Sequence, residues 1–362
     1  MGISGEDAIY RKLILEDELI DPTTASFKQI LKREQANTGI LYRRLRRFKP
    51  DAVYIWNMKG LSASLPIICQ LLNIPIVYDL HNKWLDPISL RMDPWIHWWT
   101  KRSGLKAVFK KFISVITGRR RSYMKWMPLA RTERYDLKQS YLCSESLKQE
   151  LLESGVSAVA NLPILYPALN TENIVVKREY VRNHRFMWAG RLSSEKGPDI
   201  ALESVKLLSE QGIQIELDMF AMGEPIVRKE FREQIEDYGL IDQVKMIGIA
   251  PGEIYAHYAN YDALLYTSRS PEAMPITPIE AMLSGLPTIV SNDGGIKEVI
   301  HNDESALTFV ADDVESLVSA IKHFLTSSDA GLEIAEKANN VLLKELSFGS
   351  YVSEVESCLL VS

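Results

Sequence analysis

The stretch Arg185-Phe-Met-Trp-Ala-Gly-Arg-Leu-Ser-Ser-Glu-Lys-Gly-Pro198 decides the fold class, because it passes from strand to loop to helix. Its first part, Arg185–Ala189, is apolar enough for a buried strand, and Gly197 followed by Pro198 is a typical helix start. The helix is expected over Pro198–Gln211. A strand that leads directly into a helix indicates a parallel sheet, whose ligands meet the carboxyl ends of the strands.

Strands and helices alternate through the second half of the chain. The alternation begins after a loop rich in Pro and Asn, residues 161–170, which we take as a domain boundary. The further strands are expected at Ile213–Ala221, Val244–Ile247, Ala263–Thr267, Thr288–Ser291 and Ala306–Val310. The further helices are expected at Ile226–Tyr238 and Val314–Thr326, with closing helices at Asp329–Glu345 and Tyr351–Leu360.

The first half shows a shorter version of the same pattern. We expect strands at Asp51–Trp56, Ile74–Leu80 and Ser140–Cys143, with a helix at Leu61–Leu72. His81 follows the second strand at its carboxyl end, where α/β proteins carry their chemistry, although a structural role is equally consistent. We therefore predict an α/β fold of two Rossmann-like domains that face a central cleft, with a shortened N-terminal domain. The domains are expected at 1–165 and 166–345, followed by a closing helix at 346–362.

Length and charge suit two domains with different partners. The 362 residues carry a net charge of −5. Residues 1–165 hold 26 Lys and Arg against 16 Asp and Glu, whereas residues 166–362 hold 16 against 31. Three scattered cysteines favour neither a disulfide framework nor a zinc site. Without a signal-peptide pattern or an apolar run long enough to span a bilayer, a cytoplasmic protein is expected.

Two cations flank the loop after the strand 185–189. Gly190 and Arg191 come first, and Lys196 lies just before the helix. A helix N-terminus presents unpaired N–H groups and binds anions, so these cations predict a phosphate site. In the other interpretation both cations only cover a solvated loop, which is the commoner meaning of so short a motif.

A pair of carboxylates lies in Glu272-Ala-Met-Pro-Ile-Thr-Pro-Ile-Glu280. In the structural interpretation, Thr277 caps a helix and Glu280 completes a capping box. In the functional one, Glu280 accepts hydrogen bonds from ribose hydroxyls and Glu272 from a sugar. The backbone N–H groups of Met274 and Ile276 would then meet phosphate or sugar at the same helix start.

Residues 95–121 combine aromatic and apolar residues at helical spacing with many Lys and Arg. A basic amphipathic segment with Trp on its apolar side favours contact with an anionic membrane surface. Ordinary packing of the segment on its own domain is the alternative. No motif supports nucleic-acid binding.

Taken together, these residues resemble the "group 1" family of retaining glycosyltransferases with the two-Rossmann-domain (GT-B) fold, from about residue 49 to the C-terminus. The motifs that carry the resemblance are Trp188–Gly197, Met222–Pro225, Val244–Gly248, Tyr261–Ala263, the E-x7-E pair Glu272 and Glu280 with Ala281–Pro287, and Gly294–Glu298.

The resemblance implies a role for each site residue. Arg191 and Lys196 would bind the diphosphate of a nucleotide sugar, Glu280 the ribose, and Glu272 the transferred sugar. His81 matches the histidine of the family's N-domain that faces the reaction centre, so His81 and Glu272 are the expected catalytic residues. No Asp-x-Asp metal site is evident, so no metal or cofactor is expected beyond the nucleotide diphosphosugar co-substrate.

Two features depart from the family pattern. Only about fifty residues precede the first strand, and the family's Gly-rich loop after that strand has no counterpart. Pro275 stands where the family often has Gly, and it removes one backbone donor from the phosphate loop.

The sequence thus predicts a retaining glycosyltransferase that moves a hexosyl unit from a UDP- or GDP-sugar to a hydroxyl of a glycan or lipid-linked acceptor, without a metal. It would work in the cytoplasm, peripheral to the inner face of the membrane. Two alternatives remain open: a protein that binds nucleotide sugars without turnover, and a sugar-nucleotide 2-epimerase on the same fold.

Overall fold

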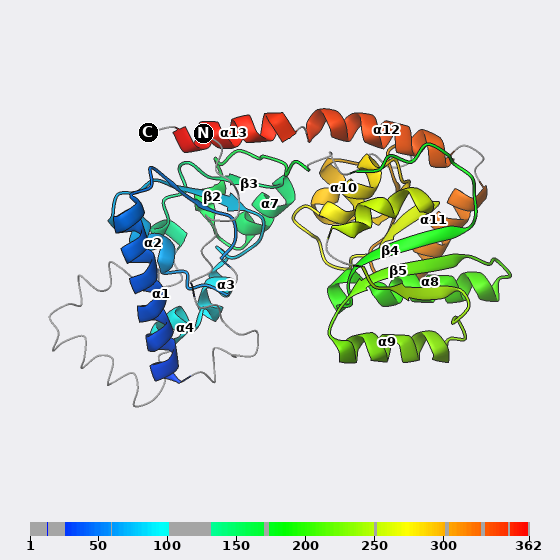
Figure 1. Cartoon of the computed structure of the whole chain (residues 1–362), viewed down its shortest axis with the longest axis horizontal. Coiled ribbons are helices and arrows are strands. Elements are labelled where there is room, and N and C mark those ends of the chain that lie inside the picture. The colour runs from blue at the N-terminus through cyan, green and yellow to red at the C-terminus, as the bar shows by residue number, and fades with distance from the viewer. Residues whose placement is uncertain are drawn as a thin grey trace. The chain divides into compact units, whose positions relative to one another are not determined.

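The computed structural model describes residue 13 and residues 26–58, 60–100, 132–169, 174–249, 252–300, 304–326, 330–346 and 348–360. The chain divides into two compact units, coloured by residue number in Figure 1. The N-terminal unit comprises Met1–Cys143, Leu147–Ile164 and Val355–Ser362. The C-terminal unit comprises Ser144–Ser146 and Leu165–Glu354.

The C-terminal unit is built on a six-stranded sheet in the order β6-β5-β4-β7-β8-β9, in which every pair of neighbours is parallel. All six strands expected from the sequence are confirmed, because each is a short, mostly apolar run between turn residues. The strands are β4 (Arg185–Arg191), β5 (Glu216–Met222), β6 (Val244–Ile247), β7 (Ala263–Tyr266), β8 (Thr288–Ser291) and β9 (Leu307–Phe309).

The strand order of this sheet contains a switch point between β4 and β7. From β4 the chain builds outward through β5 to β6, then returns to pair β7 with the other side of β4. In open α/β sheets the loops part at such a point, and the crevice at the strands' carboxyl ends binds ligands. The topology therefore predicts a ligand site at the loops that follow β4 and β7.

Helices of the C-terminal unit pack on this sheet through apolar stripes. In α8 (Pro198–Glu210), the buried residues Ile200, Ala201, Val205 and Leu208 recur at helical spacing and join the core around Trp188. Pro198 takes the first helical position, as expected. The other described helices are α9 (Pro225–Asp237), α10 (Ile276–Leu283), α11 (Val314–Thr326), α12 (Ala330–Glu345) and α13 (Phe348–Leu360). The residues of α13 from Val355 onward are assigned to the N-terminal unit.

The N-terminal unit carries a smaller parallel sheet in the order β1-β2-β3, so the α/β class is confirmed in both units. The three strands in the described part of this unit agree with a reduced N-terminal domain. The strands are β1 (Val53–Ile55), β2 (Ile76–Leu80) and β3 (Tyr141–Leu142). The helices are α1 (Phe27–Phe48), α2 (Leu65–Leu71), α3 (Pro87–Met92), α4 (Pro94–Thr100) and α7 (Glu145–Glu153).

Two helices of this unit differ from expectation. The 22-residue α1 was not foreseen; Ser26 and Gln29 form a capping box at its start. α2 begins at Leu65 rather than Leu61, because Ser62 and Ser64 use their hydroxyls in a turn and Pro66 then sets the first helical turn.

The proposed membrane segment 95–121 falls mostly outside the described residues. Its described part belongs to α4, where the Trp95 side chain is buried at 6% exposure and Ile96 is fully buried. These two residues therefore pack within the N-terminal unit. None of the helices in the described ranges has a stretch both long and apolar enough to cross a bilayer.

Candidate functional site

The loop after β4 is pressed against the end of β7. Lys196 closes a 3-10 turn, Ser194–Lys196, and Gly197 follows in the left-handed conformation with φ of 58°. A Cβ atom at Gly197 would lie 2.1 Å from the carbonyl oxygen of Thr267, so only glycine allows this approach. The switch point thus brings the Lys196 loop onto the segment that leads to Glu272.

Lys196 and Glu272 meet at this point. The Lys196 Nζ lies 2.5 Å from the Glu272 Oε2, and the Tyr266 hydroxyl donates to the other carboxylate oxygen. Both charged side chains are about a quarter exposed. A carboxylate has roughly four acceptor positions, so Glu272 keeps room for the hydroxyls of a ligand.

Glu280 lies one turn into α10 and is held by two tyrosines. The Tyr255 and Tyr258 hydroxyls donate to its two oxygens at 2.8 and 3.0 Å. Burial raises the pKa of Glu280, and the two phenol hydrogen bonds lower it in part. Burial and the nearby carboxylate raise the pKa of Tyr255 to about 12, so this phenol stays a donor at neutral pH. Each oxygen of Glu280 retains one acceptor position, a suitable arrangement for two adjacent hydroxyls.

The expected capping box around Glu280 is wrong. α10 begins at Ile276 with Pro275 in the N-cap position, and among the described side chains none caps it. Thr277 is therefore already helical, and Glu280 lies too far into the helix to reach back to the cap. The first helix turn instead leaves backbone N–H groups such as that of Ile276 for an anion, and Pro275 contributes none. Met274 is buried beside this start.

Arg191 is not drawn into the cluster of Lys196 and Glu272. It ends β4 with a side chain 59% exposed, and its guanidinium lies 3.5 Å from the Glu195 carboxylate. Gly190 precedes it, and a Cβ atom there would lie 3.1 Å from the Trp188 ring. Arg191 remains near the Lys196 loop in sequence and is exposed enough to meet a ligand.

Several supporting residues were missed by the sequence analysis. Arg269 forms two hydrogen bonds to Asp199, at 2.8 and 2.5 Å, and a third to Asp312 at 2.5 Å. Its backbone N–H donates to the Glu195 carbonyl, so it ties the loop after β7 to the loop after β4. No short motif marks these residues: Tyr266 lies six residues from Glu272, and the partners of Arg269, Tyr255 and Tyr258 are at least 22 residues away.

The Asn292–Gly295 turn has a structural role. The Gly295 N–H donates to the Glu272 carbonyl at 2.8 Å. A Cβ atom at Gly295 would lie 1.8 Å from the Ala273 carbonyl oxygen, and one at Gly294 would lie 2.5 Å from that of Glu272. The two glycines therefore let this turn support the backbone that carries Glu272.

His81 lies at the carboxyl end of β2 in the N-terminal unit. Its Nε2 is 2.7 Å from Oδ1 of Asp79, a side chain only 1% exposed. The Tyr54 hydroxyl donates to the other oxygen of Asp79 and lies 2.8 Å from the Tyr141 hydroxyl. The sequence pointed to His81 but not to Asp79, which is hidden inside an apolar strand.

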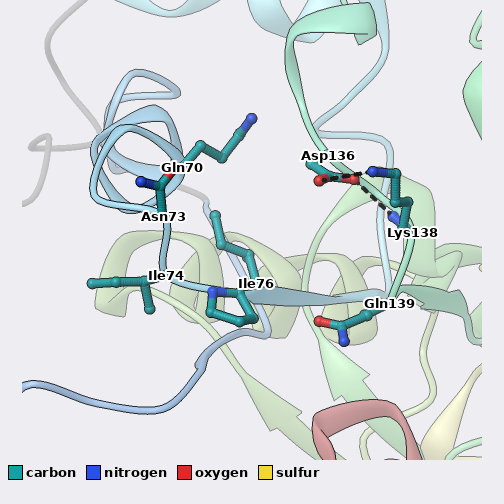
Figure 2. A pocket seen from close by; sticks show the side chains of 8 residues that line it. Gln70, Asn73, Ile74, Ile76, Asp136, Lys138 and Gln139 are labelled. Atoms are coloured by element: carbon teal, nitrogen blue, oxygen red, sulfur yellow. Dashed lines mark hydrogen bonds and ion pairs between the residues drawn. The ribbon is translucent and has the colours of Figure 1, made fainter. Parts of the chain in front are cut away.

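A cavity of about 550 Å³ in the N-terminal unit does not include His81 among its lining residues. Figure 2 shows Gln70 and Asn73 on one side and Asp136 and Lys138 on the other, with Ile76 at the start of β2. These residues precede β2 and β3, so the cavity belongs to the amino ends of the strands, whereas His81 follows the carboxyl end. Within the described ranges, no three His, Cys, Asp or Glu side chains are grouped to hold a metal ion.

Parts of this chain are similar to known proteins. The chain is 29% identical over 143 residues to the amylovoran biosynthesis glycosyltransferase AmsK of Erwinia amylovora, covering 38% of this chain and 35% of AmsK. It is 31% identical over 140 residues to the putative colanic acid biosynthesis glycosyltransferase WcaL of Escherichia coli strain K12, covering 37% of this chain and 34% of WcaL. The aligned part thus spans about a third of the length of these curated relatives.

Among solved structures, the fold is similar to that of Anabaena Alr3699/HepE in complex with UDP-glucose. The TM-score is 0.66 at 18% sequence identity, over 91% of this chain and 83% of that chain. Residues 170–341, which contain Lys196, Glu272 and Glu280, match the family model of glycosyl transferases group 1. This match covers just under half of the 362-residue chain, and the chain has the GT-B fold.

Proposed function

We propose that the protein transfers a hexosyl unit from a nucleotide diphosphosugar to a hydroxyl group of a glycan, with retention of the anomeric configuration. The observation that carries the proposal is the meeting of Lys196 with Glu272 at the β4–β7 switch point, beside the uncapped start of α10. The names of the relatives, which concern amylovoran and colanic acid biosynthesis, support a polysaccharide acceptor.

In this proposal the C-terminal unit binds the donor. Lys196, Arg191 and the N-terminal turn of α10 bind the diphosphate, Glu280 binds the ribose, and Glu272 binds the hexose. The bound UDP-glucose of the similar Anabaena structure supports a UDP-sugar, and a GDP-sugar fits the same groups. The hydroxyl pairs of ribose match the two oxygens that Tyr255 and Tyr258 hold in place on Glu280.

The transfer step exchanges one bond at the anomeric carbon for another. The acceptor oxygen bonds to that carbon as its bond to the diphosphate oxygen breaks, and the hydroxyl proton leaves with the diphosphate. The two cations and the N-terminus of α10 stabilise the negative charge that develops on the departing diphosphate. We therefore propose that transfer needs no metal. We assign His81, which lies in the N-terminal unit, as the catalytic group beside Glu272, and it contacts the substrate.

The function is tested by presenting the purified protein with UDP- and GDP-hexoses. Thermal unfolding identifies the donor, because a ligand at 100 times its dissociation constant adds about 2.7 kcal/mol of stability. NMR of the product then gives its configuration, with and without EDTA. An α-linked product from an α-linked donor is expected in both. An inverted product, an epimerised nucleotide sugar, or binding without any transfer or hydrolysis would each refute the proposal.

We further propose that the protein works in the cytoplasm at an anionic membrane surface, with a lipid-linked glycan as acceptor. The excess of Lys and Arg in residues 1–165 supports this location. Flotation with phosphatidylglycerol vesicles is expected to carry the protein upward at low salt and less so at 1 M salt. Equal flotation with neutral phosphatidylcholine vesicles would contradict an electrostatic attachment.

A further inference from the structure

Aromatic and polar side chains line one face of the N-terminal sheet at its carboxyl edge. Residues two apart in a strand share a face, so Trp56 lies on the side of Tyr54, and His81 on the side of Asp79. The contacts agree with this spacing. The rings of Trp56 and His81 lie edge to face, with centroids 6.1 Å apart, and the Tyr54 hydroxyl donates to Asp79.

The inner part of this row fixes the imidazole of His81. Asp79 is paired with Tyr141 in the register of β2 and β3, and its carboxylate is in contact with both His81 and Tyr54. A buried carboxylate is unfavourable unless it is hydrogen-bonded. The cluster therefore holds one ring nitrogen of His81 against Asp79. The imidazole ring is 22% exposed, so its other atoms can contact a ligand.

The outer part of the row is an exposed indole with amides beside it. Trp56 is 63% exposed directly after β1, although large aromatic side chains are normally covered. The neighbouring residue Asn57 accepts a hydrogen bond at 3.2 Å from the amide of Asn82, which follows His81. A flat apolar ring with amide and imidazole groups at its edge suits a ligand with one apolar face and hydroxyls around its rim.

A pyranose ring has this form, because the C–H groups of one face are apolar and its hydroxyls project at the edge. We propose that Trp56, His81 and the Asn57–Asn82 pair bind a pyranose ring of the acceptor glycan, with the ring stacked on the indole and Asp79 as a positioning residue for His81. This inference rests on the proposed function, in which the acceptor is a glycan. It places the acceptor at the carboxyl ends of β1 and β2.

The experiment titrates the full chain with four methyl α-D-pyranosides, those of glucose, galactose, mannose and N-acetylglucosamine. Saturation-transfer NMR reports contact, and the fluorescence change lost in Trp56→Phe assigns it to this indole. At least one pyranoside is expected to bind, with affinity at least tenfold weaker in Trp56→Ala. Ile88→Ala is the matched control, because Ile88 is an apolar residue of the same unit that is 68% exposed. Binding by no pyranoside, or undiminished binding by Trp56→Ala, would overturn the proposal.

Nucleotide binding, measured in parallel, separates this proposal from the proposed function. Trp56→Ala is expected to bind UDP or GDP as the wild type does, since those contacts lie in the C-terminal unit. Pyranoside binding that needs Trp56, in a protein that transfers no sugar, would uphold this site and refute the function. Transfer by a protein whose pyranoside binding ignores Trp56 would do the reverse.

Asp79→Asn tests the positioning role. The ¹⁵N chemical shifts of the His81 ring report which nitrogen carries the proton, and a merely structural contact would leave them unchanged. We expect the tautomer ratio to shift and pyranoside affinity to fall, while nucleotide affinity stays the same. Unchanged His81 shifts would remove Asp79 from the proposal.

Discussion

Replacing Lys196 with Met tests the central contact of the proposed donor site. The change keeps the side-chain length but removes the cation that lies 2.5 Å from Glu272. Hydrogen bonds to charged groups contribute about 1.5–3 kcal/mol. The affinity for UDP or GDP should therefore fall by about 10- to 150-fold, since each 1.4 kcal/mol is a factor of ten. The affinity for uridine or guanosine, which lack phosphates, should not change.

The same substitution should have little effect on folding. Both side chains of the pair are partly solvated, and partly exposed ion pairs contribute at most about 1 kcal/mol. In a unit of this size, that corresponds to a decrease in Tm of about 2–4 °C. Calorimetric unfolding measures this change, and isothermal titration measures the nucleotide affinity.

Lys206→Met is the matched control for both measurements. Lys206 lies on the solvent side of α8, 41% exposed, and its Nζ is 4.0 Å from a Glu210 oxygen. It should not change nucleotide affinity, and loss of the Lys206 contact with the Tyr238 ring should lower Tm by no more than Lys196→Met does. If Lys196→Met binds UDP and GDP as tightly as Lys206→Met does, Lys196 does not bind the diphosphate, and the assignment of the phosphate loop is wrong.

Three further substitutions test other parts of the structure. Glu280→Gln should reduce the preference for UDP or GDP over the 2′,3′-dideoxy nucleotide, as measured by titration, because a neutral amide accepts ribose hydrogen bonds less strongly; an unchanged preference would exclude the ribose role. Gly295→Ala should lower the free energy of unfolding in denaturant by at least about 1–3 kcal/mol, because its Cβ would overlap the Ala273 carbonyl oxygen. Gly349→Ala, which has open space around the new Cβ, should not lower it. Equal stabilities of the two variants would contradict the packing around Gly295. Burial raises the pKa of Glu34 from 4.5 to about 7, so the folded protein favours the neutral carboxyl group. The contribution of this group to the free energy of unfolding is therefore complete below pH 4.5, and about 3 kcal/mol of it is lost as the pH rises through 7. Glu34→Gln should remove this loss, and unfolding curves with an unchanged pH slope would show that Glu34 is not the group responsible.

The sheet of the C-terminal unit could be predicted from sequence because each strand is an apolar run bounded by turn residues. The sequence also showed that Lys196 and Glu272 both follow predicted strands, and ligands of a parallel sheet meet the carboxyl ends of its strands. The contact between the two side chains was not predicted, because it depends on the strand order, which pairs β4 with β7.

The residues that the sequence could not reveal act through tertiary approach. Tyr255 and Tyr258 reach Glu280 because a 3-10 segment (Glu253–Ala256) and the one after it pack beside α10, and their spacing carries no motif. The start of α10 was misplaced because Thr277-Pro278 has the composition of a cap, although Ile276 is already helical. Asp79 was overlooked because a polar residue in an apolar strand gives no sign of its partner.

The contact of Gly197 with the Thr267 backbone has a consequence for variation in this protein. Together with the bonds from Arg269 to Glu195 and from Gly295 to Glu272, it joins three loops, main chain to main chain. An inserted residue in any of them would force the other two apart. Variant libraries of this region should therefore exchange side chains around this junction and keep the loop lengths fixed.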